Sequence, residues 1–561
     1  MQLAHFLEAS LKPWGTALAA ALFNRAALPI AEGRHSDHAQ GRAAQAEAAP
    51  ASSIVARRED AWQRLEALSP PAEVVSAAAQ AARMVLFEQL PLTPAEWQPA
   101  VIGSHAVDGA LTLNFATAAV CSSAMHAVHD VHTLSLHTAR AAEKIAPLAD
   151  AQQLIDTLCT AVQMPALRSL NLDFCRSKVS RTVEALAPAL SALSARVSHL
   201  AALRLNCHCI DAEGAAALAK PLRLLTALTA LELMGNAVHT VGAEALAPAL
   251  TGLSRLADLR LSSNRIGAAG AAALAPPLAA LTALTALDLG YNNLDDGGAE
   301  ALAPALTRLS RLADLDLATN HIGDDGAAAL AQPLGLLTAL TALNLSNNYL
   351  GGDRAEALLL ALSRLVQLAD LRLENIDICT VYTAALAQPL GALTALTALY
   401  LCYNDLGPDG IEELAPALRR LSRLAHLNLA CNMIKFRGAA ALAEPLCALT
   451  ALTALDFRFC EMGAAGAKAL APALSRLTRL ADLALSGNQI TDAGAIMMAQ
   501  PLAALTALTP FNLRGNLVTG VGARALAPAL NRLALLSQLD LHDNGITLAG
   551  LKALMPALPW T

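Results

Sequence analysis

Two short segments contain residue types that could bind a metal ion. Histidine recurs at three-residue steps from His126 to His132, shortly after Cys121, and residues 207–209 read Cys-His-Cys. Neither segment has the paired C-x-x-C spacing that is typical of structural zinc sites. These histidines and cysteines are therefore interpreted as packed or solvated side chains, and we predict neither a metal site nor a cofactor.

Nucleotide-binding and catalytic signatures are also missing from the sequence. Neither G-x-x-x-x-G-K-[ST] nor G-x-G-x-x-G after an expected strand occurs. The repeats described below continue almost to the last residue, so we expect no room for a cysteine ligase domain. We therefore predict a non-enzymatic protein whose chemistry is binding.

The residues that could bind a partner stand between regularly spaced leucines. Residues Leu281–Leu294, LTALTALDLGYNNL, fit the leucine-rich-repeat pattern L-x-x-L-x-L-x-x-N-x-L. The frame recurs in steps of 28 residues from His208 to Asn544, with departures at Ile376 and Cys460. Because asparagine can bond backbone groups of the turn after a strand, we predict a structural ladder. The asparagines concerned are Asn236, Asn264, Asn292, Asn320, Asn348, Asn404, Asn432, Asn488, Asn516 and Asn544.

The alternation L-x-L predicts a short strand in each repeat, with leucines on one side and variable residues on the other. Variable residues would then form the concave face, which is the usual contact face of solenoids. They are polar and mixed in charge, which suits a protein partner. We expect the strongest contacts from the aromatic and arginine residues between 372 and 459. The predicted partner-binding residues are Arg260, Asp288, Tyr291, Asp316, Asn344, Arg372, Tyr400, Tyr403, Asn428, Asp456, Arg458 and Phe459.

The second half of each repeat reads as a helix, for example Gly298–Leu309, with apolar residues on one face. Its recurrent proline, such as Pro304, predicts a kink or a break that opens a second short helix. Repeats alternate in pairs of 56 residues and resemble the ribonuclease-inhibitor class of leucine-rich repeat. The predicted fold class is therefore an α/β leucine-rich-repeat solenoid, a horseshoe of strand-plus-helix repeats with a parallel sheet on its concave face.

Composition and patterning divide the chain into three parts. Residues 1–60 are expected to be disordered and to contain a possible secretion signal. Residues 61–145 are predicted to be a helical F-box-like region or an N-terminal cap, and residues 146–561 to hold about 14 repeats. A degenerate first strand is expected at Val131–Leu136.

The sequence contains no run of about 20 apolar residues, so we predict no membrane span. A net charge of −7 argues against nucleic acid as the main partner, and we expect a monomer with reduced cysteines.

The frame GAxALA recurs in the helical half of the repeats, for example at 298–303 and 466–471. This frame resembles the GALA family of type III effectors of plant-pathogenic bacteria. The resemblance implies an F-box before the repeats, which would bind the Skp subunit of a host cullin ubiquitin ligase. It also implies virulence activity after secretion into the host cytoplasm or nucleus, whereas a protein outside this family would be cytoplasmic. The residues that fit an F-box are Pro94, Val101, Ile102, Leu113, Val120 and Cys121.

Three functions remain open at this point. The first is an F-box and repeat adaptor that brings a protein target to a host ubiquitin ligase. The second is a binding scaffold or inhibitor without any ubiquitin link, in which residues 61–145 only cap the repeats. The third, with least support, is a GTPase activator of the Ran type, because those proteins carry a long acidic tail that this sequence lacks.

Overall fold

A computed structural model describes residues 110–114, 133–137, 167–173, 199–206, 210–352, 354, 356–378 and 380–554. The chain divides into two compact units, residues 1–98 and 99–561, and every described residue belongs to the second unit. The expectations for residues 1–60 therefore lie outside the described residues. Within the described part of the chain, no helix is both long enough and apolar enough to cross a membrane.

The described strands form one parallel sheet of sixteen strands in strict sequence order. Each strand pairs with the next in the same register, so that Leu371, Leu399 and Leu427 lie side by side. From β4 onward this regular register follows from the constant 28-residue step, because each repeat places its leucines at the same height. The strands are β1 (Ala110–Asn114), β2 (Thr133–His137), β3 (Ser169–Asp173), β4 (Ala202–Asn206), β5 (Ala230–Glu232), β6 (Asp258–Arg260), β7 (Ala286–Asp288), β8 (Asp314–Asp316), β9 (Ala342–Asn344), β10 (Asp370–Arg372), β11 (Ala398–Tyr400), β12 (His426–Asn428), β13 (Ala454–Asp456), β14 (Asp482–Ala484), β15 (Pro510–Asn512) and β16 (Gln538–Asp540).

The sheet begins earlier in the chain than the repeat domain predicted from residue 146. The degenerate strand expected around Leu134 is present as β2, and β1 precedes it as a further strand. Leu113, assigned above to the F-box-like residues, lies in β1 and pairs with Leu136. The other five F-box-like residues lie outside the described part of the chain.

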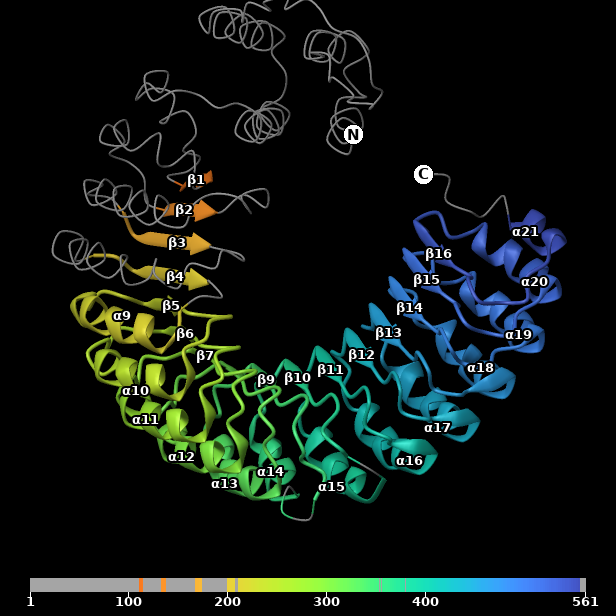
Figure 1. Cartoon of the computed structure of the whole chain (residues 1–561). Coiled ribbons are helices and arrows are strands. Elements are labelled where there is room, and N and C mark those ends of the chain that lie inside the picture. Colours follow the sequence, from red (N-terminus) through yellow and green to blue (C-terminus); the bar gives the residue numbers. More distant parts are fainter. Residues whose placement is uncertain are drawn as a thin grey trace, which may run out of the picture. The chain divides into compact units, whose positions relative to one another are not determined.

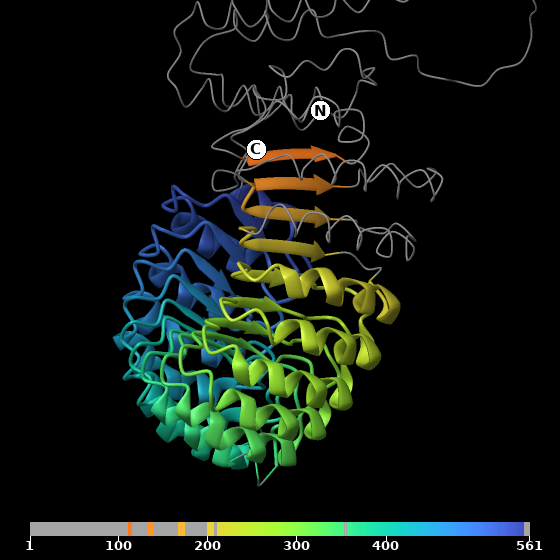
Figure 2. The same ribbon diagram turned by 90° about the vertical axis from the view of Figure 1, so that its left-hand side faces the viewer.

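From β4 onward, helices connect successive strands and cover one side of the sheet (Figures 1 and 2). In this curved array the strands line the inner side and the helices the outer side. The helices are α9 (Ala212–Leu224), α10 (His239–Leu250), α11 (Gly267–Ala280), α12 (Asp295–Leu306), α13 (Asp324–Leu336), α14 (Glu356–Ala361) with the 3₁₀ turn η4 (Leu362–Arg364), α15 (Thr380–Leu390), α16 (Gly407–Leu418), α17 (Lys435–Ala448), α18 (Gly463–Leu474), α19 (Asp492–Leu502), α20 (Gly520–Leu530) and α21 (Leu548–Leu554). This arrangement confirms the predicted solenoid of strand-plus-helix repeats.

The sequence predicted that the recurrent proline causes either a kink or a break followed by a second short helix. The structure shows no such break at Pro304 or Pro333. Helix α12 continues through Pro304 to Leu306, and α13 continues through Pro333 to Leu336. Both prolines lie in the last turn of their helices, so the lost bond and the steric conflict concern the carbonyl one turn earlier, and only the final turn follows the distortion. The helix also starts earlier than expected, because α12 begins at Asp295, before Gly298.

Gly298 lies where α12 packs closely on α11. A Cβ atom at this position would lie 2.9 Å from Leu294 Cβ and 3.3 Å from Ala268 Cα. Because that space does not exist, the GAxALA frame requires glycine for packing rather than for starting the helix. The frame therefore sets the helix-to-helix distance on the outer side of the array.

The core lies between the sheet and the helices, and it consists mainly of leucine, with alanine and isoleucine next in frequency. Leu371 and Leu399 on the strands, and Leu330 and Leu414 on the helices, have at most 1% of their surface exposed. Burying a leucine side chain contributes on the order of 2 kcal/mol. Every repeat contributes several such residues, so the core extends along the whole described array.

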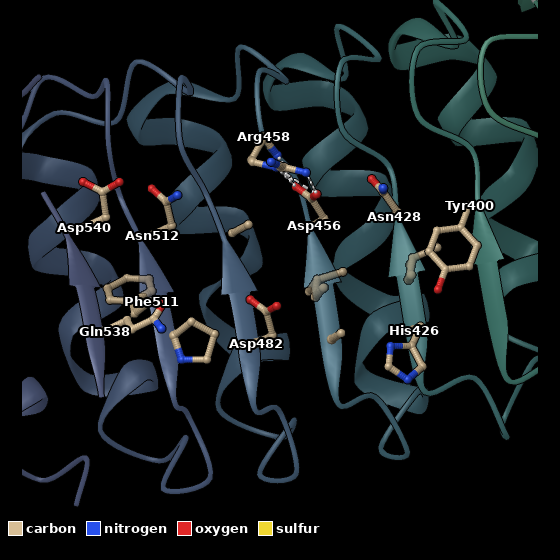
Figure 3. Close-up of a pocket in the computed structure, with 15 residues that line it drawn as sticks. Tyr400, His426, Asn428, Asp456, Arg458, Asp482, Phe511, Asn512, Gln538 and Asp540 are labelled. Carbon is tan, nitrogen blue, oxygen red and sulfur yellow. Dashed lines mark hydrogen bonds and ion pairs between the residues drawn. The ribbon is translucent and has the colours of Figure 1, made fainter. Parts of the chain in front are cut away.

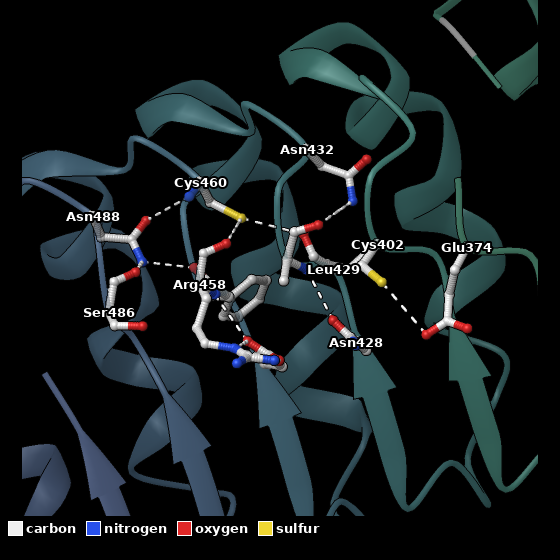
Figure 4. A network of polar contacts seen from close by, with 12 residues as sticks. Glu374, Cys402, Asn428, Leu429, Asn432, Arg458, Cys460, Ser486 and Asn488 are labelled. Atoms are coloured by element: carbon white, nitrogen blue, oxygen red, sulfur yellow. Dashed lines mark hydrogen bonds and ion pairs between the residues drawn. The ribbon is translucent and has the colours of Figure 1, made fainter. Parts of the chain in front are cut away.

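The asparagine ladder forms as predicted. In a typical copy, Asn432 Nδ2 donates to the carbonyl oxygens of Leu401, Leu429 and Ala430, and its Oδ1 accepts from Leu406 N and Asn404 N. These bonds satisfy buried backbone groups in two adjacent repeats. Cys460 replaces asparagine in one copy, and its Sγ donates to Leu429 O at 3.2 Å (Figure 4). At Ile376 the column provides no polar side chain, as the sequence indicated.

Candidate functional site

The exposed side of the sheet consists of two columns of side chains on either side of the buried leucines. In β13, for example, Ala454 and Asp456 lie on the exposed side while Leu455 is 2% exposed. Identical register from strand to strand aligns the first residues in one column and the third residues in another. Carboxylates outnumber arginines on strands β5 to β10, with Arg260 and Arg372 as the basic residues there.

Three predicted residues, Arg260, Asp288 and Asp316, line a small hollow of about 60 Å³ over β6 to β8. Ser262 Oγ donates to Asp288 Oδ2 at 2.8 Å, and Gly290 N donates to Asp288 Oδ1 at 3.0 Å. Burial raises the pKa of Asp288 above its usual value, and the Asp316 charge acts in the same direction. The Asp288 carboxylate is thus hydrogen-bonded within the cluster, and the negative charges of Asp288 and Asp316 repel each other.

The next strands show how the other predicted residues are held. Asn344 Nδ2 donates to Asp316 Oδ2 at 2.9 Å across β8 and β9. The guanidinium of Arg372 lies over the ring of Tyr400, with its Cζ 4.9 Å from the ring centroid. Asp370 also accepts hydrogen bonds at 3.1 Å from Arg372 Nε and Nη2. A cation–π contact of this kind contributes about 0.5–1 kcal/mol at an exposed site and fixes the orientation of both side chains.

A larger hollow of about 430 Å³ lies over strands β11 to β16 (Figure 3). It brings together four predicted residues, which are Tyr400, Asn428, Asp456 and Arg458. Its other lining residues are His426, Leu427, Ala454, Leu455, Asp482, Ala484, Pro510, Phe511, Asn512, Gln538 and Asp540. This hollow is larger than the one over β6 to β8.

Charges in the larger hollow are distributed unevenly. Arg458 donates to Asp456 Oδ2 through Nε at 2.9 Å and through Nη2 at 2.6 Å, so these two side chains neutralise each other. Asp540 accepts from His542, whose backbone N–H lies 3.0 Å from Asp540 Oδ1. Burial raises the pKa of Asp482, and the nearby charge of Asp456 raises it further, while Arg458 and His426 act in the opposite direction.

Tyr291, Tyr403 and Phe459, also predicted as partner-binding residues, lie on the loop after the strand rather than on the strand itself. Their side chains are 56%, 61% and 58% exposed. All three adopt the left-handed backbone region, with φ between 53° and 58°. Most repeats place a residue of positive φ at this point, and glycine at 487 and 515 does so without a steric penalty. The aromatic residues therefore hold a strained backbone on the surface.

The sequence analysis did not select His426, Asp482 or Asp540, although each stands at a variable position of a strand. It also passed over Phe511, Pro510 and Gln538. The available signal was Ala484, the only alanine among the central residues of the L-x-L pattern from 204 to 540. A small residue in a column of larger polar ones leaves a gap, and its neighbours become the walls of a hollow.

Within the part of the chain that the structure describes, no group of three or more histidine, cysteine, aspartate or glutamate residues could hold a metal ion. Both metal-like segments named above, around His129 and at residues 207–209, lie outside the described residues. Burial raises the pKa of the Cys402 thiol to about 12, with a further contribution from the charge of Glu374. Cys402 is therefore protonated at neutral pH and is a poor nucleophile.

Comparison with known families supports the architecture. The leucine-rich-repeat family model matches residues 198–219, 225–247, 256–275, 280–303, 312–331, 448–471, 480–499 and 533–555. A comparison with curated protein sequences gave no significant match. An internalin of Listeria monocytogenes is a similar solved structure, with 23% identity and a TM-score of 0.42, covering 62% of this chain and 92% of that chain. The TLR13–ssRNA13 complex matches with 18% identity and a TM-score of 0.39, covering 75% of this chain and 62% of that chain.

The repeats, the single parallel sheet and the family matches define a leucine-rich-repeat solenoid. Proteins with such repeats are generally non-enzymatic scaffolds that bind protein partners. The exposed strand columns are the surface that this fold offers for that purpose.

Proposed function

We propose that this protein is a non-enzymatic adaptor that binds a protein target on the inner face of its sheet. The observation that supports this proposal best is the hollow over β11 to β16, where polar and aromatic side chains surround an open surface. Tyrosine and arginine carry much of the binding energy in protein interfaces, and Tyr400 and Arg458 both line the hollow. Both side chains are exposed to solvent only in part, so a partner would meet pre-oriented groups.

We propose further that the protein acts as a type III effector of the GALA type inside a host cell. In this role the F-box-like segment would bind a host Skp subunit, and the repeats would select the target for ubiquitin transfer. The support is the recurrence of GAxALA in the helices and the order of the elements, with an F-box-like segment before the repeats. A scaffold without a ubiquitin link is the alternative that the same inner face would serve.

The adaptor proposal predicts two kinds of binding, to a Skp protein and to a target protein. Each can be tested separately with the full-length chain. The double variant Val101→Asp and Ile102→Asp is expected to abolish retention of a purified plant Skp protein, because charge at both positions would disrupt an apolar contact. The double variant Tyr400→Ala and Arg458→Ala is expected to retain Skp binding and to lose the proteins captured from host extract. Mass spectrometry of the captured material, compared among the variants, measures both outcomes.

A matched control is Lys468→Ala, because Lys468 is exposed on α18 on the opposite side of the sheet. This variant should behave as the wild type in both assays. If the wild type does not retain the Skp protein, the adaptor role is excluded and the scaffold alternative remains. If the inner-face variant captures the same proteins as the wild type, binding on this face is excluded.

A further inference from the structure

The larger hollow has an apolar floor, which arises from small residues in both columns. In the first-residue column, Ala454 precedes Asp482 and Pro510 follows it. In the third-residue column, Ala484 lies between Asp456 and Asn512. The gap thus opens beside Asp482, whose side chain projects from β14 among these small neighbours (Figure 3).

The charge in this hollow is negative and is only partly compensated. Asp456, Asp482 and Asp540 contribute carboxylates, and Arg458 is the one guanidinium that lines the hollow. Both Nε and Nη2 of Arg458 already bond to Asp456 (Figure 3). The charge of Arg458 favours the Asp482 anion from a distance, but the hydrogen bonds of Arg458 go to Asp456, and burial disfavours the Asp482 anion.

The shape and charge of the hollow indicate which kind of partner side chain would fit it. An acidic side chain would meet three carboxylates, and the basic groups that line the hollow are Arg458, already bonded to Asp456, and the His426 imidazole, so repulsion would disfavour it. A purely apolar side chain would cover the Asp482 carboxylate without replacing its hydration, which is unfavourable. A basic side chain has an aliphatic stem for the apolar floor and a cationic head for the carboxylate.

We propose that the hollow beside Asp482 is a specificity site for an arginine side chain of the partner protein. The stem would pack on Ala454, Ala484 and Pro510, and the guanidinium would donate two parallel hydrogen bonds to the Asp482 carboxylate. Arginine matches the site because its planar head pairs with a carboxylate through two N–H groups and is weakly hydrated. This inference rests on the proposed function, since it names the chemistry by which the inner face selects its partner.

The test uses the full-length chain and N-acetyl-arginine methylamide as the probe, in 0.15 M NaCl. Saturation-transfer difference NMR detects weak binding of such a small molecule to a large protein. We expect the wild type to bind the probe, and Asp482→Asn to weaken that binding by about fivefold or more, as for a well-formed ion pair. The neutral citrulline analogue should bind the wild type as weakly as the arginine probe binds Asp482→Asn.

Two further variants separate this site from general attraction to an acidic surface. Asp314→Asn removes the same charge from the same column on β8, outside the hollow, and should leave probe binding unchanged. Ala484→Phe fills the floor but keeps Asp482, and it should also abolish binding. Circular dichroism melting curves verify that each variant is folded.

Equal binding of the arginine and citrulline probes, or equal loss in Asp482→Asn and Asp314→Asn, would overturn the arginine site. Absence of probe binding to the wild type would overturn it as well. That failure is distinguishable from failure of the proposed function, which depends on target capture by the Tyr400 and Arg458 variants. If those variants lose the target although the probe does not bind, the inner face is a protein-binding surface without an arginine site.

Discussion

At the scale of single residues, the asparagine column shows how much one side chain contributes to each repeat. Asn488 Nδ2 donates to three carbonyl oxygens, including Phe457 O at 2.6 Å, and its Oδ1 accepts from Cys460 N and Met462 N. Leaving such buried backbone groups unsatisfied costs about 1–3 kcal/mol each. The column therefore stabilises the turns after the strands, which are also the turns that carry the aromatic loop residues.

Cys460 is a weak version of the same arrangement, and this leads to a prediction. Its thiol donates to Leu429 O and, more distantly, to Arg458 O at 3.5 Å, and a thiol is a weaker donor than an amide. We predict that Cys460→Asn raises the free energy of unfolding by about 1 kcal/mol, because the amide makes the bonds that Asn488 and Asn432 make. Urea unfolding followed by circular dichroism measures the change.

The control for this prediction is Cys447→Asn, at a partly exposed position on α17 outside the column. Asparagine has a lower helix propensity than most residues, so this variant should not gain stability. Equal or lower stability of Cys460→Asn compared with the wild type would show that the site is too tightly packed around sulfur to accept an amide.

At the scale of elements, neighbouring helices are joined by carboxylates that cap the helix of the next repeat. Asp492, the first residue of α19, accepts from Thr519 N at 2.7 Å, Thr519 Oγ1 at 2.5 Å and Gly522 N at 2.8 Å in α20. Asp296 in α12 does the same for Gly323 N and Gly326 N at the start of α13. Because these bonds satisfy N–H groups that have no partner within their own helix, they couple one repeat to the next.

The carboxylate of Asp492 should make stability depend on pH in the acid range. Burial alone would raise its pKa, but the hydrogen bonds from Thr519 and Gly522 bring the pKa below the usual value of an aspartate. A carboxyl group with a lowered folded pKa contributes stability above its unfolded pKa, and this contribution is lost as pH falls through the folded pKa. We predict that Asp492→Asn lowers stability by about 0.3–1 kcal/mol at pH 7, because the amide keeps one acceptor oxygen but loses the negative charge at the start of α20.

Near pH 2 the difference between Asp492→Asn and the wild type should shrink, since the wild-type carboxyl is then protonated. Thermal unfolding at pH 7 and at pH 2 measures both values. Asp405→Asn serves as the control, because Asp405 is an exposed loop residue whose positive φ asparagine tolerates. A difference for Asp492→Asn that is constant across this pH range would contradict the capping explanation.

Some features of the fold could be predicted from the sequence and others could not. The 28-residue step was sufficient for the strands, the leucine core and the asparagine ladder, because each follows from a local pattern repeated in register. It was not sufficient for the effect of Pro304, whose cost depends on how close to the helix end the residue lies. The hollow was also out of reach, since it depends on the combined sizes of Ala454, Ala484 and their neighbours on separate strands.

At the scale of the whole array, stability should be a sum of repeats and of contacts between neighbours. Among the described elements, each helix packs on the helices directly before and after it, and each strand pairs with the directly adjacent strands. No element of the described array bridges distant repeats in this pattern. Solenoids built in this way can unfold in segments, because a weak repeat separates the stable parts on either side of it.

This architecture predicts that the position of a core defect decides how the array unfolds. Leu399 on β11 and Leu513, just after β15, are both fully buried, so replacement by alanine should cost about 2–5 kcal/mol in either case. Leu399→Ala places the defect between two long runs of repeats, and we expect amide hydrogen exchange to accelerate locally from β10 to β12 while both flanks stay protected. Leu513→Ala should instead accelerate exchange only from β14 to β16.

Urea unfolding of Leu399→Ala should broaden or split into two transitions, with a lower apparent m-value. Urea unfolding of Leu513→Ala should keep one main transition. If both variants unfold in one transition of unchanged m-value, the array is a single cooperative unit. In that case the strands β11 to β16 would fold and unfold together, and the binding surface on them would form or disappear in one step.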